Sequence, residues 1–409
     1  MNIVLEPGAA ALLDELHRAG FGAYAVGGCV RDSLLGLAPH DWDLCTAARP
    51  GQVMELFGED RCIPTGLQHG TVTVKRDGKL YEITTFRTEG RYSDGRHPDS
   101  VAFVPDLRED LARRDFTINA MAYSAEEGLC DPFGGREDLA RGVVRAVGEP
   151  LRRFGEDALR ILRLYRFAAR FGFAIDEATE AAAKQLASHL DCVSAERIEE
   201  ELNKLLAAPQ PGAYLEPEVL AFVLPELPPE ELTKARRRID ALPAGAEQVS
   251  ARWAALLLPL GETGARKALK RLKCSNARID GAVALVRECG EKTPDTLDKC
   301  DLRLQAKRLL GKYDLHTVQQ LTALWTALAP EEKALFDALR AEAEALTAQG
   351  TCCRISQLAV NGRDLMEAGA APGPGLRRVL EALLEEVITG RLPNEKTELL
   401  AFAAEFSAS

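Results

Sequence analysis

The sequence predicts an α+β protein in which a small sheet-bearing head is followed by an elongated part built of helices. Between Tyr24 and Val147, short runs rich in β-branched and aromatic residues alternate with glycine turns, a pattern typical of a compact α/β unit. After Pro150 such runs essentially disappear, and apolar residues recur at spacings of three and four, as on amphipathic helices. We therefore expect the domain change near Pro150.

The expected elements follow in order along the chain. Strands are predicted in the head, with a glycine turn and a short helix between the first two, at residues 24–26, 41–43, 71–74, 81–84 and 101–104. Helices are predicted after the head at residues 151–171, 178–186 and 195–206. No internal repeat or low-complexity tail interrupts this order.

The composition is that of an ordinary soluble protein. With 409 residues, of which 46% are apolar, the chain is long enough for two to four domains with cores of their own. No apolar run approaches the roughly 20 residues of a membrane-spanning helix, and no charged-then-apolar leader opens the chain. We therefore expect a cytoplasmic protein without a membrane partner, in which the ten scattered cysteines are reduced and buried.

The net charge of −11 is at odds with a nucleic-acid partner, because phosphate binding relies on clustered Lys and Arg. The local charge differs from the total, since nine arginines lie between Arg136 and Arg170. This basic stretch is consistent with a nucleic-acid partner despite the negative net charge.

The first chemical signal is a glycine turn followed by two closely spaced acids. Gly27-Gly28 is followed by Asp41 and Asp43 at the next expected strand. Carboxylates at i and i+2 of a strand point to the same face, where they can share a pair of Mg²⁺ ions about 3.5–4 Å apart. Glycines let backbone N–H groups approach a triphosphate. Either feature alone is usually structural, but together they point to metal-dependent nucleotidyl transfer.

A third acid and a polar loop lie close to this pair in the sequence. Strand alternation directs Glu82 to the opposite face from its apolar neighbours, so it is a candidate metal-site support or general base, with a solvent-facing position as the alternative. Residues 87–100 are nearly free of apolar side chains and predict a mobile loop. Within it, Asp94 and Arg96 could act as a lever at the site, although surface solubility explains most such loops.

Adjacent arginines form a second candidate segment. Residues 111–121 read LARRDFTINAM and predict a helix that begins at Arg113 and Arg114, with its apolar side chains facing inward. Guanidinium groups suit a triphosphate because they form bidentate hydrogen bonds. An ion-paired surface is the alternative.

The segment EDALRILRLYR carries the most informative pattern. Its residues Asp157, Arg160, Arg163 and Arg166 recur every three positions, which predicts a polar stripe along one helix between apolar flanks. Such a stripe is usually a solvated face, but the surrounding leucines and phenylalanines favour a groove.

Asp157 and Arg160 together could read a base. Cytosine and adenine both offer an exocyclic amino donor beside a ring-nitrogen acceptor, which a carboxylate and a guanidinium match. Uracil and guanine present the reverse polarity, so the same pair would leave buried groups unpaired. Sites of this kind discriminate by as much as about 10⁴–10⁵. We therefore expect a protein-only template that selects C and A.

The blocks GGCVRD with DWD, RRDFTINAMA, DPFGG, EDALRILRLYRF and AERIEEELNKLL occur in this order between about residues 24 and 206. In content and order they resemble the motifs of the bacterial class II tRNA nucleotidyltransferases, or CCA-adding enzymes, which are related to poly(A) polymerases. The segment ISQLAVNGRDLM from Ile355 is similar to the tail of that family.

The resemblance implies a polymerase β-like nucleotidyltransferase head over residues 1–148, a neck with the nucleotide-template helix over 149–208, a body over 209–350 and a tRNA-binding tail over 351–409. It implies that Asp41 and Asp43 hold Mg²⁺. It also implies that the incoming nucleotide contacts the positions Gly28, Arg31, Arg114, Asp157, Arg160, Arg163 and Arg166.

The implied reaction adds C, C and A to the 3′ end of tRNA from CTP and ATP, with release of pyrophosphate. In the family the loop that matches Asp94 and Arg96 helps the site switch from C to A, so its presence favours full addition. The alternatives are a poly(A) polymerase, an enzyme that adds only CC or only A, and an inactive RNA-binding protein of the same fold. The acids Asp41 and Asp43 argue against the last.

Overall fold

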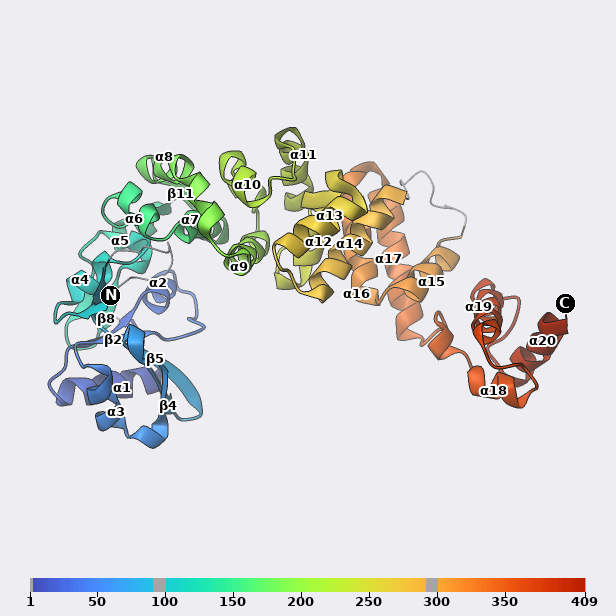
Figure 1. Ribbon diagram of the computed structural model, residues 1–409, viewed down its shortest axis with the longest axis horizontal. Helices are drawn as coiled ribbons and strands as arrows, with labels where there is room; N and C mark the ends of the chain where they lie inside the picture. Colours follow the sequence, from blue (N-terminus) through green and yellow to red (C-terminus); the bar gives the residue numbers. More distant parts are fainter. Residues whose placement is uncertain (1–2, 91–100, 292–300, 409) are drawn as a thin grey trace. The chain divides into compact units, whose positions relative to one another are not determined.

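The computed structural model describes residues 3–90, 101–291 and 301–408 (Figure 1). Contacts divide the chain into two compact units, of which the first comprises Met1–Pro229 with Arg271–Lys273 and the second Glu230–Lys270 with Cys274–Ser409. The first unit contains every strand that the structure describes in those ranges. The four-part division at residues 148, 208 and 350 stays a prediction.

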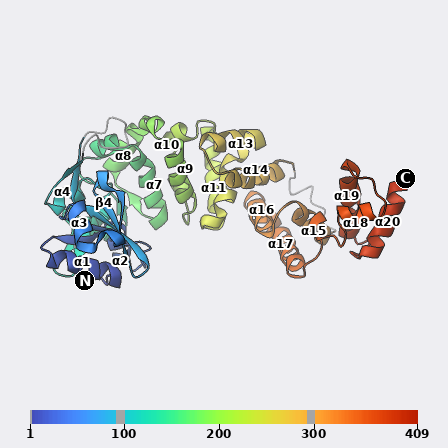
Figure 2. The ribbon, with the colours of Figure 1, turned by 60° about the horizontal axis from the view of Figure 1, so that its bottom comes forward.

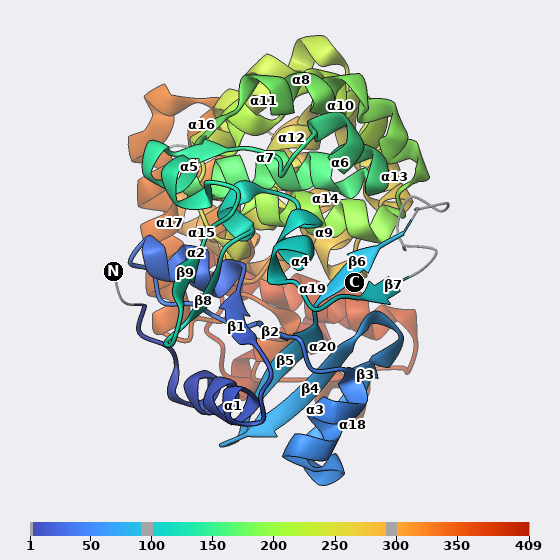
Figure 3. The same ribbon diagram turned by 90° about the vertical axis from the view of Figure 1, so that its left-hand side faces the viewer.

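A mixed sheet of seven strands organises the head. In spatial order the strands are β3 (Cys62–Gly66), β4 (Thr71–Arg76), β5 (Lys79–Thr85), β2 (Leu44–Thr46), β1 (Ala23–Val26), β8 (Ala122–Ser124) and β9 (Gly128–Cys130). The pair β2 and β5 is parallel and the other pairs are antiparallel. Figure 3 shows β1, β2, β5 and β4 side by side, with α1 (Pro7–Arg18) and α3 (Pro50–Phe57) next to them.

β5 forms where the sequence predicts it because its side chains alternate between core and solvent. Tyr81 and Ile83 on β5 are buried while Glu82 between them is exposed. The predicted strand at 101–104 is β7 (Val101–Phe103), which pairs with β6 (Arg87–Glu89) in a separate two-stranded sheet. The expectation that strands end at Pro150 needs one exception, because β11 (Ala174–Ile175) pairs with β10 (Val143–Val144).

Two predicted strand and helix assignments in the head are wrong. Asp41 and Asp43 lie just before β2 rather than within a strand, although the Asp43 carbonyl still accepts the Val26 N–H of β1 at 2.9 Å. The predicted helix at 113–121 is instead a turn with a short 3₁₀ segment, η3 (Thr117–Asn119), because α4 (Leu107–Ala112) ends before Arg113.

The predicted helix over 151–171 is interrupted at Asp157, which corrects the expected position of that residue on the helical stripe. α6 (Pro150–Glu156) ends there and α7 (Leu159–Phe171) begins two residues later. The Asp157 backbone is extended, and its carboxylate accepts the Leu159 N–H at 3.1 Å. Apolar periodicity runs through the break because both helices bury one face, so the sequence pattern gives no sign of it.

Further helices complete the first unit. They are α2 (Gly28–Leu34), α5 (Gly135–Arg141), α8 (Glu177–Gln185), α9 (Ala195–Leu206) and α10 (Pro217–Val223). Helices α7 and α9 pack against each other. The core beside the site includes Tyr24, Val26 and Val147. Phe116, just before η3, and Ile118 within it are also buried, as the sequence predicts.

The second unit is helical in the ranges that the structure describes (Figure 2). Its helices are α11 (Pro229–Asp240), α12 (Val249–Leu257), α13 (Gly261–Arg271), α14 (Asn276–Glu291), α15 (Leu302–Lys312), α16 (Leu315–Leu328), α17 (Lys333–Ala348), α18 (Gly362–Glu367), α19 (Pro374–Thr389) and α20 (Lys396–Ala408). Within the described ranges, none of the helices combines the length and the apolar character that crossing a bilayer requires. Lys307 Nζ donates to the Ile388 carbonyl at 2.8 Å, which joins α15 to α19.

Candidate active site

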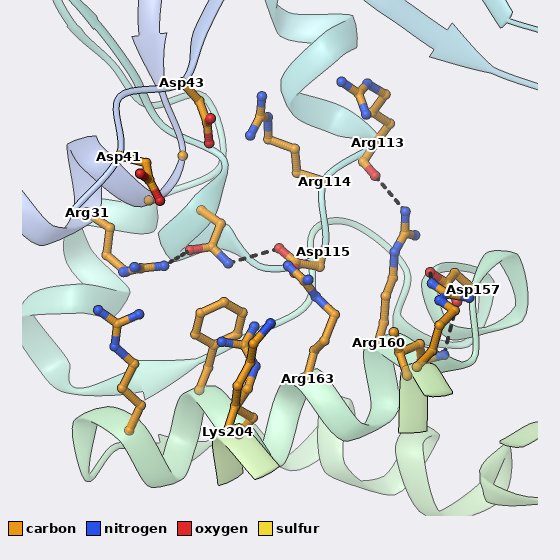
Figure 4. Close-up of a pocket in the computed structure, with 18 residues that line it drawn as sticks. Arg31, Asp41, Asp43, Arg113, Arg114, Asp115, Asp157, Arg160, Arg163 and Lys204 are labelled. Carbon is orange, nitrogen blue, oxygen red and sulfur yellow. Dashed lines mark hydrogen bonds and ion pairs between the residues drawn. The ribbon is translucent and has the colours of Figure 1, made fainter. Parts of the chain in front are cut away.

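A cavity of about 610 Å³ in the first unit brings together the glycine turn, the acid pair and helices α7 and α9 (Figure 4). Nine of the predicted site residues line it: Gly28, Arg31, Asp41, Asp43, Arg114, Asp157, Arg160, Arg163 and Arg166. Glu82 does not line it, and Asp94 and Arg96 lie outside the described residues. Side chains far apart in the sequence therefore share one cavity.

The glycine turn forms one wall. Gly27 adopts φ +77°, which favours glycine, and its N–H donates to the Met121 carbonyl at 3.0 Å. A Cβ at this position would lie 2.9 Å from Nη1 of Arg114. The absence of a side chain therefore lets a guanidinium approach the backbone turn at the start of α2.

The acid pair faces the same space. The carboxylates of Asp41 and Asp43 point into the cavity in Figure 4, with Arg114 turned toward Asp43. Asp41 is 81% exposed and lies 3.0 Å from the ring nitrogen of His40. Partial removal from water raises the pKa of Asp43, the Arg114 charge opposes the shift, and the charges of Glu82 and Asp41 add to it.

This arrangement fits a divalent cation bound by oxygen ligands. Burial, with the negative charges of Glu82 and Asp41, raises the pKa of Asp43, and a cation between Asp41 and Asp43 would offset the repulsion between the carboxylates. Among the described residues, no three His, Cys, Asp or Glu side chains are grouped so as to hold one metal ion. Glu82 is close enough to influence Asp43 electrostatically but is not grouped with the pair, and its role as a third catalytic acid stays a prediction.

Protein carboxylates hold the arginines of the cavity in place. The nearest pairs are Arg31 with Asp32 at 2.7 Å, Arg114 with Asp110 at 3.4 Å, Arg160 with Glu156 at 2.8 Å, Arg163 with Asp115 at 2.6 Å and Arg166 with Glu201 at 2.5 Å. Several of these partners are buried, so the guanidinium groups are fixed before any substrate arrives. The sequence predicted the arginines but not these partners, which come from other elements or lie beside them.

The two residues expected to read a base lie together at the junction of α6 and α7. Asp157 is held by Arg197 of α9, whose Nη2 donates to its Oδ2 at 2.8 Å. Arg160 donates through Nη2 to the Arg113 carbonyl and through Nη1 to the Arg153 carbonyl, each at 3.0 Å. Both side chains are therefore oriented by hydrogen bonds from the head and from α9.

The cavity also contains residues that the sequence analysis did not assign to the site. The polar ones are Asp115 and Asn119 around η3, Arg170 on α7, and Arg197 and Lys204 on α9, and the apolar ones are Leu159 and Phe167 on α7. Asp115 and Asn119 lie in the RRDFTINAM segment, and Arg197 and Lys204 lie in AERIEEELNKLL, so their positions in recognised motifs were the available signal.

The ionisation of Asp115, a residue of the cavity, affects the stability of the fold at low pH. Burial alone would raise its pKa, but the charge of Arg163 and hydrogen bonds from Asn119 and Arg163 outweigh burial and hold the pKa well below its usual value. A depressed pKa in the folded state stabilises the fold above the unfolded value of about 3.9, and the contribution is lost as the pH falls through that value toward the folded one.

We therefore expect the free energy of unfolding of the wild type to fall more steeply below about pH 4 than that of Asp115→Asn, by up to about 1.4 kcal/mol per pH unit. Urea unfolding at a series of pH values measures both slopes. Asp14→Asn, at an exposed position of α1, serves as the control and should follow the wild type. Parallel curves for wild type and Asp115→Asn would contradict the assignment.

Comparisons with known proteins agree with this geometry. A model described as Poly A polymerase head domain matches residues 23–145, one described as tRNA nucleotidyltransferase domain 2 matches 246–403, and one described as probable RNA and SrmB-binding site of polymerase A matches 172–228. Among the similar proteins, the CCA-adding enzyme of Limosilactobacillus fermentum is 38% identical over 410 residues, which cover 96% of this chain and 95% of that protein.

The CCA-adding enzyme of Geobacillus stearothermophilus is 38% identical over 405 residues, covering 97% of this chain and 96% of that one. The crystal structure of the Bacillus stearothermophilus CCA-adding enzyme in complex with CTP superposes with a TM-score of 0.80 at 33% identity, over 99% of this chain and 98% of that one. The chain therefore belongs to the CCA-adding enzymes, a family of tRNA nucleotidyltransferases.

Proposed function

We propose that the protein adds C, C and A in turn to the 3′ end of tRNA, with CTP and ATP as substrates and pyrophosphate as the product. The observation that carries this proposal is one cavity in which Asp41 and Asp43 face the pair Asp157 and Arg160. This arrangement supports a nucleotidyl-transfer site next to a base-reading site. Relatives about 38% identical over nearly the whole chain are CCA-adding enzymes, and one similar structure holds CTP.

In the reaction the terminal hydroxyl of the tRNA attacks the α-phosphate of the nucleotide. Nucleotidyl transfer in this family is metal-dependent in general, and we propose Mg²⁺, held by Asp41 and Asp43, because hard oxygen ligands suit it. When bound, Mg²⁺ neutralises phosphate charge and activates the hydroxyl. Glu82 is proposed to support this acid pair from β5.

The chain's own cations bind and orient the triphosphate. Gly28, Arg31, Arg114, Arg163 and Arg166 line the cavity. We propose that the start of α2 and these guanidinium groups contact the phosphates. These groups are already held by carboxylates, so little side-chain freedom is lost when the nucleotide binds. They stabilise the charge that develops on the leaving pyrophosphate.

The base is proposed to be read by Asp157 and Arg160, which accept from and donate to the pairing edges of cytosine and adenine. The loop with Asp94 and Arg96 is proposed to help the switch from C to A. We also propose the four-part division at residues 148, 208 and 350, with the tail binding tRNA, and a cytoplasmic location, where tRNA matures.

The decisive experiment incubates the purified chain with a tRNA transcript that lacks its last three nucleotides. With CTP alone we expect two additions, with CTP and ATP together three, and with UTP or GTP none, as resolved on a sequencing gel. A long ladder with ATP alone would identify a poly(A) polymerase. Arrest after two additions, with both nucleotides present, would identify a CC-adding enzyme, and binding without extension would identify an inactive RNA-binding protein.

A further inference from the structure

The side-chain amide of Asn119 connects two walls of the cavity. Its Oδ1 accepts a hydrogen bond from Nη1 of Arg31, and its Nδ2 donates to Oδ1 of Asp115 at 3.0 Å (Figure 4). Asn119 is only 6% exposed, at the end of the η3 segment. Both polar atoms of the amide are therefore used inside the protein.

At one end of this connection, Arg31 is fixed on several sides. Its guanidinium lies over the rings of Phe167 and Phe171 of α7, with its central carbon 5.2 and 4.9 Å from the ring centroids. Its Nε donates to Oδ1 of Asp32 at 2.8 Å. Its Nη2 also lies 2.7 Å from Oδ1 of Asp32, and Asn119 supplies the acceptor for Nη1, so each of the three guanidinium nitrogens has a partner.

At the other end of this connection, Asp115 is hydrogen-bonded to α7. Its Oδ2 accepts from Nε of Arg163 at 2.8 Å and from Nη2 of the same residue at 2.6 Å. Its Oδ1 accepts from the Phe116 N–H at 2.8 Å in addition to Asn119. A continuous hydrogen-bonded chain thus runs from Arg31 on α2 through Asn119 and Asp115 to Arg163 on α7.

This position requires an amide. A residue here must accept from a guanidinium and donate to a carboxylate at the same time, which asparagine does with one planar group. Aspartate could accept from Arg31 but would place a second carboxylate against Asp115, and leucine could do neither. An apolar residue would remove the acceptor of Arg31 Nη1 and one of the two donors to Asp115 Oδ1, at a cost close to that of a lost charged hydrogen bond.

We propose that Asn119 is a positioning residue, which orients the Arg31 guanidinium toward the triphosphate and ties it to the pair in which Asp115 of the head binds Arg163 of α7. The inference rests on the proposed function. It adds that one shared hydrogen-bonded chain aligns the phosphate-binding wall with the base-reading helix. A change at Asn119 is therefore expected to weaken nucleotide binding through Arg31 and Asp115, the protein partners of its two polar side-chain atoms.

The first test is Asn119→Leu in the full-length protein, with Asn203→Leu on α9 as the control. Asn203 is part-buried and does not line the cavity. We expect the KM for CTP and for ATP to rise about 10- to 100-fold, the effect of one charged hydrogen bond. The KM for tRNA at saturating nucleotide should stay within about twofold. An unchanged nucleotide KM, or an equal rise for both substrates, overturns the proposal.

The second test does not require the protein to fold with leucine at position 119. Asn119→Asp keeps the shape and the acceptor for Arg31, and Asp115→Asn supplies a donor in return. If the two side chains act as one link, the double variant should bind CTP more tightly than the product of the two single effects predicts. If the effect of the double variant equals the product of the two single effects, the side chains act independently and the link is refuted.

Folding and activity are separated by two further readouts. The thermal unfolding midpoint of each variant identifies a general loss of structure, and only variants within a few degrees of the wild type are compared. If the wild type itself fails to extend tRNA, the proposed function fails. If the wild type extends tRNA and Asn119→Leu retains the wild-type nucleotide KM, the inference alone fails.

Discussion

Replacing Asp43 by asparagine should reduce the rate of nucleotide addition at saturating substrate by about 1,000-fold or more. The side chain keeps its shape but loses the charge that holds a divalent cation against the triphosphate, and a loss of about 4 kcal/mol of transition-state stabilisation corresponds to that factor. Single-turnover incorporation of labelled CMP into tRNA measures the effect. Binding of tRNA, measured by filter retention, should be unchanged.

Asp14→Asn removes the same charge from an exposed position on α1, away from the cavity, and should retain full activity. Asp41→Asn should behave like Asp43→Asn, because both carboxylates face the same space. An Asp43→Asn enzyme within tenfold of the wild type would show that the acid pair does not hold the metal.

The second large effect concerns the choice of base. Asp157 can only accept hydrogen bonds and Arg160 can only donate them. In the double variant Asp157→Asn with Arg160→Gln, both side chains are amides, which can donate as well as accept. Uracil can then be matched as well as cytosine, so we expect kcat/KM for UTP relative to CTP to rise at least about 100-fold. Competition between the two nucleotides in a single reaction measures the ratio directly.

A matched control exists on α5, where Glu137 and Arg141 form an exposed ion pair of 2.7 Å. Changing both to glutamine removes the same two charges and should leave the nucleotide ratio as it is in the wild type. Unchanged selectivity in the Asp157 and Arg160 double variant would assign base choice to other groups in the cavity.

The sequence predicts those parts of the structure that depend on local pattern. β5 and the exposed position of Glu82 follow from alternation of apolar and polar residues. The gathering of Gly28, Asp41 and Arg160 in one cavity agrees with the order of the motifs, which the comparisons later supported. Local chemistry and motif order thus identified nine of the residues that line the cavity, although Glu82 does not line it.

The sequence could not predict features that depend on tertiary partners. The break at Asp157 is invisible in the periodicity, because the helices on both sides bury an apolar face. Asp115 was read as part of a helix, but its carboxylate instead binds a backbone N–H and Arg163 from another element. A carboxylate of this kind has no periodic signal, since its role depends on a residue 48 positions away.

The pairing of α7 with α9 limits how either helix can change. Arg166 of α7 pairs with Glu201 of α9, and Asp157, in the break just before α7, pairs with Arg197 of α9. All four side chains are largely shielded from water. A shielded charge without its counterion destabilises a protein by about 3–5 kcal/mol. A substitution that removes one of these charges must therefore be accompanied by a complementary substitution at its partner. Transfer of the base-reading helix into another protein would succeed only if α9 were transferred with it.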